Sequence, residues 1–542
     1  RKAVLSGLKR AELSDTLPPE VAATLRLRPL WTLKQALEFL HHPTPDVSLA
    51  QLEDHTHPAW QRLKAEELLA QQLSQLQSRR EREHLRAPVL RVDGAGSLHE
   101  RLLAALPFEL TAAQQRVCNE IAGDLAQSKP MHRLLQGDVG SGKTVVAALA
   151  ATICMDAGWQ CALMAPTEIL ADQHFRKLVA WLEPLGVRVA WLTGSQKKRE
   201  RTAMLELIAR GEAGLVVGTH AVIQEQVQFR NLALAIIDEQ HRFGVAQRLA
   251  LRSKSQAAEE PSPGGRRGGV GANNIITSGE DRAEREPHLL MMTATPIPRT
   301  LAMSYYADLD VSTIDELPPG RSPIVTKVVS EQRRDEVIAR IRGQLAQGRQ
   351  VYWVCPLIEE SEALDLSNAT ETHAELSAAL PGVLVGLLHS RMPVAEKKAV
   401  MSLFTGGQMG VLVSTTVIEV GVDVPNATLM VIEHAERFGL AQLHQLRGRI
   451  GRGTKASTCL LLYTAPLGET ARSRLSIMRE SNDGFVIAEE DLRLRGAGDV
   501  MGTRQSGLPD MNFATLPEHN DLLEIAQRDA QLTLNKIPDL AG

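Results

Sequence analysis

The eight residues from Gly137 to Thr144, GDVGSGKT, constrain the fold of this chain more than any other feature. They fit the pattern G-x-x-x-x-G-K-[ST], whose glycines let the backbone curl until its N–H groups face a phosphate. Residues 131–136 before the loop have the character of a short strand, and residues 144–156 after it carry apolar side chains at helical spacing. A helix that begins at such a loop adds positive potential for an anion. The sequence therefore predicts an α/β fold that binds a nucleoside triphosphate.

The members of this loop have separate predicted roles. Lys143 is expected to reach the β- and γ-phosphates, and Thr144 is expected to bind Mg²⁺. The remaining contacts fall to glycines whose backbone approaches the phosphates, namely Gly137, Gly140 and Gly142. We therefore expect ATP and Mg²⁺ as cofactors. A glycine-rich turn without a ligand is the less favoured interpretation, because a strand and a helix are both indicated beside the loop.

The composition limits the remaining classes of protein. At 542 residues the chain is too long for one core and suggests about three or four domains. No run approaches about 18 uncharged apolar residues, so no membrane partner is expected. The net charge of −4 excludes indiscriminate polyanion binding by the whole surface, but it is compatible with a local nucleic-acid groove. The five cysteines are scattered without a C-x-x-C pair, which indicates buried thiols in a reducing compartment and disfavours a structural zinc.

Strands and helices alternate around the phosphate-binding loop. Short apolar stretches predict strands at 131–136, 161–165, 188–192, 215–218, 234–238 and 288–292. Strands separated by helical stretches form a parallel sheet with right-handed crossovers, as in RecA-like domains. The fifth stretch delivers Asp238 and Glu239 to the carboxyl edge of that sheet. We expect Asp238 to hold hydrated Mg²⁺ and Glu239 to orient and deprotonate the attacking water, in preference to a solvated strand end.

A second alternation follows residues 317–323, LPPGRSP, which break both periodicities and are interpreted as an interdomain hinge. Strands are predicted at 324–329, 351–354, 383–388, 410–413, 428–433 and 458–463, and helices at 331–345 and 394–404. The sequence has no second G-x-x-x-x-G-K-[ST], so ATP is expected between two RecA-like domains. Arg449 and Arg452, in the segment QLRGRIGR, are three residues apart and are predicted to neutralise the γ-phosphate from the second domain. A basic helix end is the alternative.

Four regions are expected along the chain. Residues 1–106 form a helical segment and linker with one long helix at 60–86, residues 107–320 and 321–470 form the two RecA-like domains, and residues 471–542 form a C-terminal helical and loop element. Six glycines and three prolines at 253–287 predict a flexible insertion. Phe108 and Gln114, just before the phosphate loop, offer an aromatic face and an amide that suits N6 and N7 of adenine. A helix cap followed by glutamine is the simpler interpretation of that segment.

These features together resemble the superfamily 2 helicases. In chain order, the segment from Phe108 to Gln114 is similar to the adenine-reading Q motif, GDVGSGKT to motif I, residues 165–168 to motif Ia, 238–241 (DEQH) to motif II, Thr293 to Thr295 to motif III, 414–416 with 419–423 to motif V, and 445–452 to motif VI. Longer blocks resemble the bacterial RecG branch: 238–248, 293–321, LLHSRM at 387–392, and 491–499 with 502–507, which is similar to the translocation motif of that branch. The resemblance runs from about residue 8 to residue 529.

The resemblance implies an ATP-driven translocase on duplex DNA that regresses stalled replication forks and migrates branched junctions in recombination and repair. It implies strand contacts at Pro166, Thr167, Gly194, Ser195, Thr219 and His220 in the first domain and at His389, Arg391, Ser414 and Thr415 in the second. Coupling between ATP and DNA is expected at Thr293, Thr295, Gln445, Arg495 and Arg504. It further implies a monomeric motor in the bacterial cytoplasm, associated with the nucleoid, with branched and duplex DNA and single-stranded DNA-binding protein as partners.

The chain departs from the RecG-like pattern at its start. RecG-like chains carry an N-terminal OB-fold wedge, but the first hundred residues lack closely spaced strands, and the chain does not begin with Met. We therefore expect the wedge to be missing and the motor to be intact. Two other functions stay open. A transcription-repair coupling translocase would need further domains before Phe108, and an ATP-gated DNA-binding scaffold without turnover is disfavoured by the presence of Glu239, Arg449 and Arg452.

Overall fold

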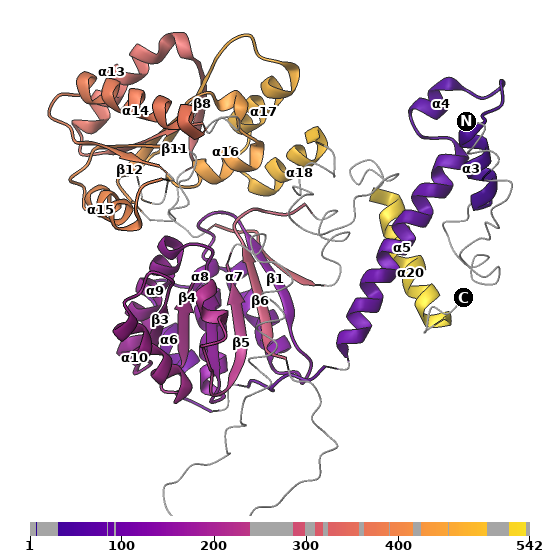
Figure 1. The fold of residues 1–542 in the computed structure, drawn as a ribbon, viewed down its shortest axis with the longest axis horizontal. Helices are drawn as coiled ribbons and strands as arrows, with labels where there is room; N and C mark the ends of the chain where they lie inside the picture. The colour runs from indigo at the N-terminus through magenta and orange to yellow at the C-terminus, as the bar shows by residue number, and fades with distance from the viewer. Residues whose placement is uncertain are drawn as a thin grey trace, which may run out of the picture. The chain divides into compact units, whose positions relative to one another are not determined.

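The computed structural model describes residues 7, 31–83, 85–91, 94–238, 286–298, 309–317, 323–356, 362–389, 391–415, 424–451, 453, 455–495 and 520–537. The chain divides into two compact units (Figure 1). One unit comprises Leu85–Pro296 and Val311–Asp491, and the other comprises Arg1–His84, Ile297–Asp310 and Leu492–Gly542. The predicted insertion at 253–287 lies outside the described residues except for its last two.

The first unit contains a seven-stranded sheet with the order β3-β4-β2-β5-β6-β1-β7. Its strands are β1 His132–Gly137, β2 Gln160–Met164, β3 Val189–Leu192, β4 Leu215–Gly218, β5 Leu232–Ile237, β6 His288–Thr293 and β7 Asp310–Ile314. The pairs from β3 through to β1 are parallel. The six predicted strands are confirmed to within two residues at each end. The edge strand β7 was not predicted, because the stretch that forms it, DVSTI, is short and polar.

Helices pack around this sheet. We call the sheet and these helices together the first fold. The helices are α6 Leu98–Ala105, α7 Ala112–Leu125, α8 Lys143–Asp156, α9 Glu168–Leu182 and α10 Lys198–Ala209. The apolar spacing of residues 144–156 predicted a helix with one apolar side. The helix α8 is present, but it is buried all the way from Val145 to Cys154 because α6, α7 and the strands β2 and β5 surround it. Its start, which carries the phosphate loop, is therefore held rigidly.

A six-stranded parallel sheet forms the core of the second fold, with the order β10-β11-β9-β12-β13-β8. The strands are β8 Val325–Ser330, β9 Gln350–Cys355, β10 Val385–Leu388, β11 Val411–Thr415, β12 Ala427–Ile432 and β13 Thr458–Tyr463. The helices are α13 Arg334–Leu345, α14 Glu362–Ala379, α15 Val394–Thr405, α16 Leu440–Arg447, α17 Glu469–Glu480 and α18 Gly484–Arg495. The chain is therefore an α/β protein with two tandem RecA-like folds, as predicted.

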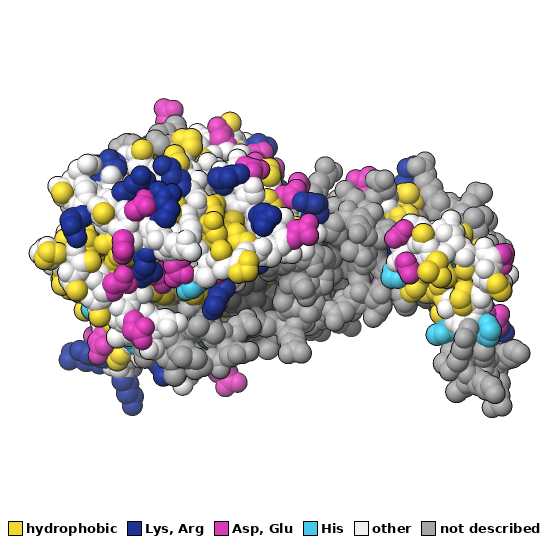
Figure 2. Space-filling view, turned by 90° about the horizontal axis from the view of Figure 1, so that it is seen from above, with side chains coloured by type: hydrophobic (Ala, Val, Ile, Leu, Met, Phe, Trp, Pro, Cys, Tyr) yellow, Lys and Arg dark blue, Asp and Glu magenta, His cyan; other side chains and the backbone are white. Residues whose placement is uncertain are grey.

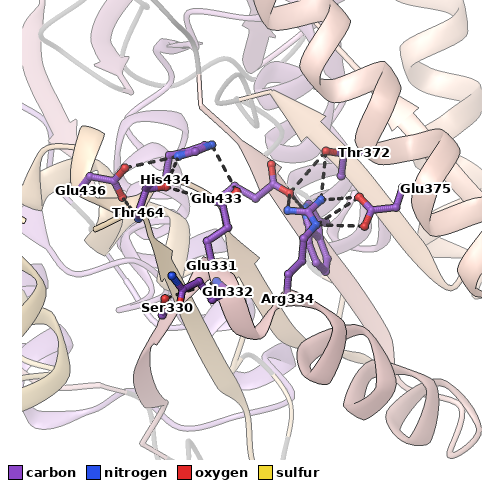
Figure 3. A network of polar contacts seen from close by, with 11 residues as sticks. Ser330, Glu331, Gln332, Arg334, Thr372, Glu375, Glu433, His434, Glu436 and Thr464 are labelled. Carbon is purple, nitrogen blue, oxygen red and sulfur yellow. Dashed lines mark hydrogen bonds and ion pairs between the residues drawn. The ribbon is translucent and has the colours of Figure 1, made fainter. Parts of the chain in front are cut away.

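A polar network stabilises the carboxyl edge of the second sheet (Figure 3). The Glu433 carboxylate directly follows β12 and is only 6% exposed. It accepts a hydrogen bond from Nε1 of Trp353 at 2.7 Å and pairs with the guanidinium of Arg334. That guanidinium also pairs with Glu375 at 2.9 Å and lies over the Trp353 ring at 5.0 Å from its centroid. The buried charge of Glu433 is thus compensated by one arginine from α13.

The other unit is helical. Its described elements are α3 Leu33–His41, α4 Leu49–Glu53, α5 Pro58–Glu83 and α20 Asn520–Lys536. The helix α5 confirms the long helix predicted at 60–86. Near the two ends of the chain, α5 and α20 lie side by side (Figure 1), with Leu69 packed on Ala530 and Arg80 donating to the carbonyl of Leu534 at 3.2 Å. The charged end of α5 therefore has a structural contact within its own unit.

On the face drawn in Figure 2, lysine and arginine side chains of the second fold are interspersed with acidic ones. All five cysteines are buried, as predicted, and burial raises the pKa of the Cys118 and Cys459 thiols to about 12. Among the described helices, none is long and apolar enough to span a bilayer.

Candidate nucleotide and nucleic-acid site

The carboxyl edge of the first sheet is divided into two halves. The predicted nucleotide-site residues follow β1, β5 and β6, which are neighbours in the order β5-β6-β1. The predicted DNA contacts of this fold follow β2, β3 and β4, which are neighbours in the order β3-β4-β2. The strands β2 and β5 join the halves, and the backbone N–H of Asp238 after β5 donates to the Met164 carbonyl on β2 at 2.8 Å. The fold thus collects residues that are far apart in sequence into two adjacent groups.

The phosphate loop has the conformation that its sequence predicts. Gly140 and Gly142 have positive φ, and Gly142 stands before α8 with φ of +89°. The ammonium group of Lys143 donates to the carbonyls of Gly137 at 2.7 Å and Asp138 at 2.9 Å, so the side chain folds over the loop. The hydroxyl of Ser141 is fully buried and has no hydrogen-bond partner among the residues that the structure describes. An unpaired buried hydroxyl, a lysine and the first turn of a helix in one loop fit a bound phosphate group.

Gln114 lies against this loop. Its side-chain oxygen accepts from the Thr111 N–H at 3.0 Å, and its amide nitrogen donates to the Ser141 carbonyl at 2.9 Å. A Cβ atom at Gly142 would meet that nitrogen at 2.2 Å, so only glycine admits this contact. Phe108 is 46% exposed and lines an open hollow of about 580 Å³, together with Leu103, Ala104, Leu106, Pro107, Glu109, Leu110 and Gln115. The two residues of the predicted adenine site therefore lie on opposite ends of one short segment, and Gln114 also caps α7.

Asp238 stands directly after β5, as predicted. Its Oδ2 lies 2.6 Å from Nε2 of His174 on α9, and both side chains are largely buried. The sequence gives no signal for His174, because a single histidine on a helix has no distinguishing pattern. Glu239, which follows Asp238 and is the second acid of the predicted catalytic pair, lies outside the described residues. Thr293, at the end of β6, and Thr295 share a hydrogen bond of 2.9 Å between their hydroxyls, next to these acids in strand order.

The predicted DNA contacts of the first fold are held at loop and helix starts. The Thr167 hydroxyl caps α9, and the Thr219 hydroxyl caps the short helix His220–Ile223. Ser195 donates from its hydroxyl at 2.6 Å and from its N–H at 3.1 Å to the carboxylate of Glu168, the residue after Thr167. Three of the predicted contacts, Gly194, Ser195 and His220, are solvent-exposed, while Pro166 and Thr167 are half-buried. The structure therefore brings these residues to one part of the sheet edge.

In the second fold, the predicted DNA contacts follow the neighbouring strands β10 and β11. Arg391 is exposed, and His389 is half-buried, with no hydrogen bond from its Nδ1 to any of the described residues. Ser414 and Thr415 end β11 with buried hydroxyls that have no hydrogen-bond partner within the described part of the chain. These two hydroxyls are buried in this conformation, so the structure does not bring them to the surface where a DNA strand could contact them. The segment after β11, 416–423, lies outside the described residues.

The helix α16 carries the start of the predicted arginine segment. Gln445 and Arg449 are half-buried, while Arg452 and Arg504 lie outside the described residues and only the backbone of Arg495 is described. Two further residues of α16, His444 and Arg447, lie at this end of the second fold. His444 places Nε2 at 2.6 Å from Oδ1 of Asp138 in the phosphate loop, and Arg447 is buried behind it at 2% exposure. The only signal for them is their position within and beside QLRGRIGR.

Comparisons with known proteins agree with this geometry. The family model DEAD/DEAH box helicase matches residues 111–304, and Helicase conserved C-terminal domain matches 333–454. The two RecA-like folds therefore form the two-domain core of the helicase class. A third model, ATP-dependent DNA helicase RecG, domain 3, C-terminal, matches residues 481–540. The chain belongs to the RecG family of ATP-dependent DNA helicases, with 51% identity to the RecG of Escherichia coli (strain K12) over 99% of this chain and 73% of the relative.

More distant relatives and solved structures extend the comparison. The RecG of Bacillus subtilis (strain 168) is 44% identical over 96% of this chain and 70% of its own length. A solved structure of RecG bound to a three-way DNA junction has a TM-score of 0.71 and 40% identity; the match covers 95% of this chain and 62% of that one. The DUF1998 helicase MrfA bound to DNA and AMPPNP, at 15% identity and a TM-score of 0.51, is similar in fold alone.

Proposed function

We propose that this chain is an ATP-driven motor that translocates on duplex DNA and remodels branched DNA in recombination and repair. The observation that carries the proposal is the divided carboxyl edge of the first sheet. Residues for a nucleotide follow β5, β6 and β1, and residues for a nucleic-acid strand follow β3, β4 and β2. Because the two halves share one rigid sheet, a change at the nucleotide is transmitted directly to the strand contacts.

The nucleotide half supplies the groups that hydrolysis requires. ATP would lie with its phosphates in the loop before α8 and its adenine against Phe108 and Gln114. Thr144 and Asp238 would hold Mg²⁺, which neutralises phosphate charge in such enzymes. Glu239 would orient the attacking water and accept its proton, and Arg449 and Arg452 would neutralise the γ-phosphate from the second fold. Cleft closure between the folds would then be necessary for turnover.

The nucleic-acid half is suited to binding without reading sequence. Small hydroxyl residues and glycines allow backbone N–H groups to approach strand phosphates, and such contacts fix register but carry no base information. Support comes from the hydrogen bonds that already hold Thr167, Ser195 and Thr219 at the strand ends. Thr293, Thr295 and Gln445, with Arg495 and Arg504, would couple the two halves. From the family resemblance we further propose that the motor is monomeric and works in the bacterial cytoplasm, in association with the nucleoid. Single-stranded DNA-binding protein is its proposed protein partner.

The proposal is tested by ATP hydrolysis with and without model forks, four-way junctions and plain duplex. Branched DNA should stimulate turnover, and Lys143→Ala or Glu239→Gln should lower that rate by about 10² or more, the size expected for a lost transition-state contact. Lys129→Ala is the matched control. It changes an exposed lysine that precedes the start of β1, away from the phosphate loop at the end of that strand, and it should leave the rate unchanged. Stimulation that survives Lys143→Ala would refute the site. DNA affinity that responds to ATP without turnover would instead support the scaffold function.

A further inference from the structure

Two buried side chains and one half-buried side chain form a line from the second fold to the phosphate loop. Arg447 donates from Nη2 to Nδ1 of His444 at 3.2 Å, which leaves the ring proton of His444 on Nε2. Nε2 lies 2.6 Å from Oδ1 of Asp138, the second residue of GDVGSGKT. Arg447 is 2% exposed and His444 is 5% exposed. The hydrogen bonds thus run from α16 into the loop that is proposed to hold the phosphates.

Both ends of this line are fixed. Arg447 donates from Nη1 to the carbonyls of Met478 at 2.7 Å and Ser481 at 2.8 Å and to the Thr326 hydroxyl at 3.2 Å. At the other end, Oδ1 of Asp138 also accepts from the Val139 N–H at 2.6 Å. Although burial acts in the opposite direction, the hydrogen bonds from His444 and Val139 and the charge of Lys143 hold the pKa of Asp138 below its ordinary value. The imidazole is therefore held by α16 on one side and by the loop on the other.

Two glycines, Gly448 and Gly484, lie beside this contact. A Cβ atom at Gly448 would lie 2.7 Å from Cβ of Val139. A Cβ atom at Gly484, where α18 begins, would lie 2.6 Å from Nε2 of His444 and 3.0 Å from Oδ2 of Asp138. Glycine at both positions lets α16 and α18 approach the loop this closely. The Asp138 carbonyl in turn accepts from the Lys143 ammonium at 2.9 Å, so what fixes Asp138 also fixes the loop lysine.

We propose that His444, which belongs to the second fold, is a positioning residue that holds the phosphate loop in the conformation that binds nucleotide. It acts through Asp138 and touches no nucleotide itself. The consequence is that the second fold controls nucleotide affinity by a route separate from Arg449 and Arg452, which act on the reacting phosphate. This inference rests on the proposed ATP-dependent function and adds a named contact through which one fold adjusts the site of the other.

The test uses the full chain with saturating junction DNA, the KM for ATP, and equilibrium binding of a fluorescent ADP analogue. In His444→Ala, both the KM and the dissociation constant should rise about tenfold, as for one lost hydrogen bond to a charged group, with kcat within about twofold of wild type. His444→Gln keeps a donor near the position of Nε2 and should restore most of the affinity. His373→Ala is the matched control, since it removes an imidazole in the second fold that bonds the Val385 carbonyl at 3.0 Å.

Two further variants make the outcome decisive. Gly484→Ala keeps both residues of the pair but would place a Cβ atom 2.6 Å from Nε2 of His444, so the imidazole must shift and the KM should also rise. This variant serves if His444→Ala does not fold. The double variant His444→Ala with Asp138→Ala should bind nucleotide no more weakly than whichever single variant has the lower affinity. Additive effects, or an unchanged KM and ADP affinity alongside a lower Tm, would overturn the proposal. If DNA did not stimulate ATP hydrolysis by the wild-type chain, the proposed function would be contradicted. The ADP affinities of the variants could still be compared, because ADP binding is measured without turnover.

Discussion

The imidazole of His174 holds one carboxylate oxygen of Asp238, with 2.6 Å between Nε2 and Oδ2. His174 belongs to α9, the helix that Thr167 caps and that follows β2 in the nucleic-acid half of the sheet edge. Asp238 belongs to the nucleotide half. A side chain attached to one half therefore orients the proposed magnesium ligand of the other.

From this contact we expect His174→Ala to weaken Mg²⁺ binding. Partners that orient a metal ligand are worth about 10- to 100-fold in metal affinity, so the Mg²⁺ concentration for half-maximal ATPase should rise by that factor. Mn²⁺ binding followed by electron paramagnetic resonance gives a second reading without turnover. His132→Gln, a partly exposed histidine at the start of β1, is the control. A lower Tm with unchanged metal affinity would assign His174 to packing alone.

The Arg334 network predicts a large loss of stability. Arg334→Met leaves the buried Glu433 carboxylate without its cation, and breaking a buried pair in this way costs about 3–5 kcal/mol. The loss should appear in urea unfolding followed by tryptophan fluorescence. Arg333→Met removes an exposed pair with Glu336 next to it and should leave the unfolding curve in place. In Arg334→Met combined with Glu433→Gln no uncompensated charge remains, so a double variant as unstable as Arg334→Met would contradict this account.

His288 predicts a loss of stability in acid. Its Nδ1 accepts from the Met131 N–H at 3.0 Å and its Nε2 donates to the Pro88 carbonyl at 2.7 Å, so the ring is bound in its neutral form. Burial lowers the pKa of His288 to about 4. Because the folded pKa lies below the unfolded one of about 6.5, stability is complete above pH 6.5 and falls by about 1.4 kcal/mol per pH unit towards pH 4. In His288→Gln this part of the slope of Tm against pH should disappear, and an unchanged slope would refute it.

His434 predicts the opposite dependence in the second fold. Its hydrogen bond with Glu436, opposed by burial and aided by the charge of Glu331, raises the pKa of His434. Arg437 also faces it and lowers the value, and the Thr464 hydroxyl is 3.1 Å from Nδ1. The stabilisation is therefore complete below the unfolded pKa and is lost as the pH rises through the raised folded pKa.

The measurement for His434 is a titration of its ring protons by nuclear magnetic resonance, with stability curves from pH 5.5 to 8.5. The side chain is partly exposed, so the effect should stay below about 1 kcal/mol. His434→Asn is the suitable variant, because the residue has φ of +47° and Asn tolerates that region. A folded-state pKa at or below the ordinary value would contradict the prediction.

Much of the fold could be predicted from the sequence because its strands are buried on both faces. The segments that form β4 and β13 are continuous apolar runs, and their predicted bounds match the structure at both ends. The strand β7 could not be found in this way, since it lies at an edge and three of its five residues, Asp310, Ser312 and Thr313, are polar. The complete burial of α8 was also missed, because apolar spacing indicates one face and the tertiary surroundings decide the others.

Only some of the residues of the candidate site could likewise be predicted from the sequence. Spacing located the phosphate loop, the acid after β5 and the arginine segment, because each follows a strand or opens a helix in a fixed pattern. His174, His444 and Arg447 could not be found, since each acts through a partner that is far away in sequence and lies next to it only in the fold. The roles of Glu239, Arg452 and Arg504 stay predictions outside the described residues.

The burial of all five thiols has a practical consequence. Thiol-reactive dyes attack the thiolate, which these cysteines rarely form, so the natural chain already serves as an unreactive background for labelling. One cysteine at Arg188 in the first fold and one at Arg333 in the second, both exposed, would accept a donor and an acceptor dye. Single-molecule energy transfer between them would then record, in the unmodified core, whether nucleotide and DNA bring the two folds together in one step or in several.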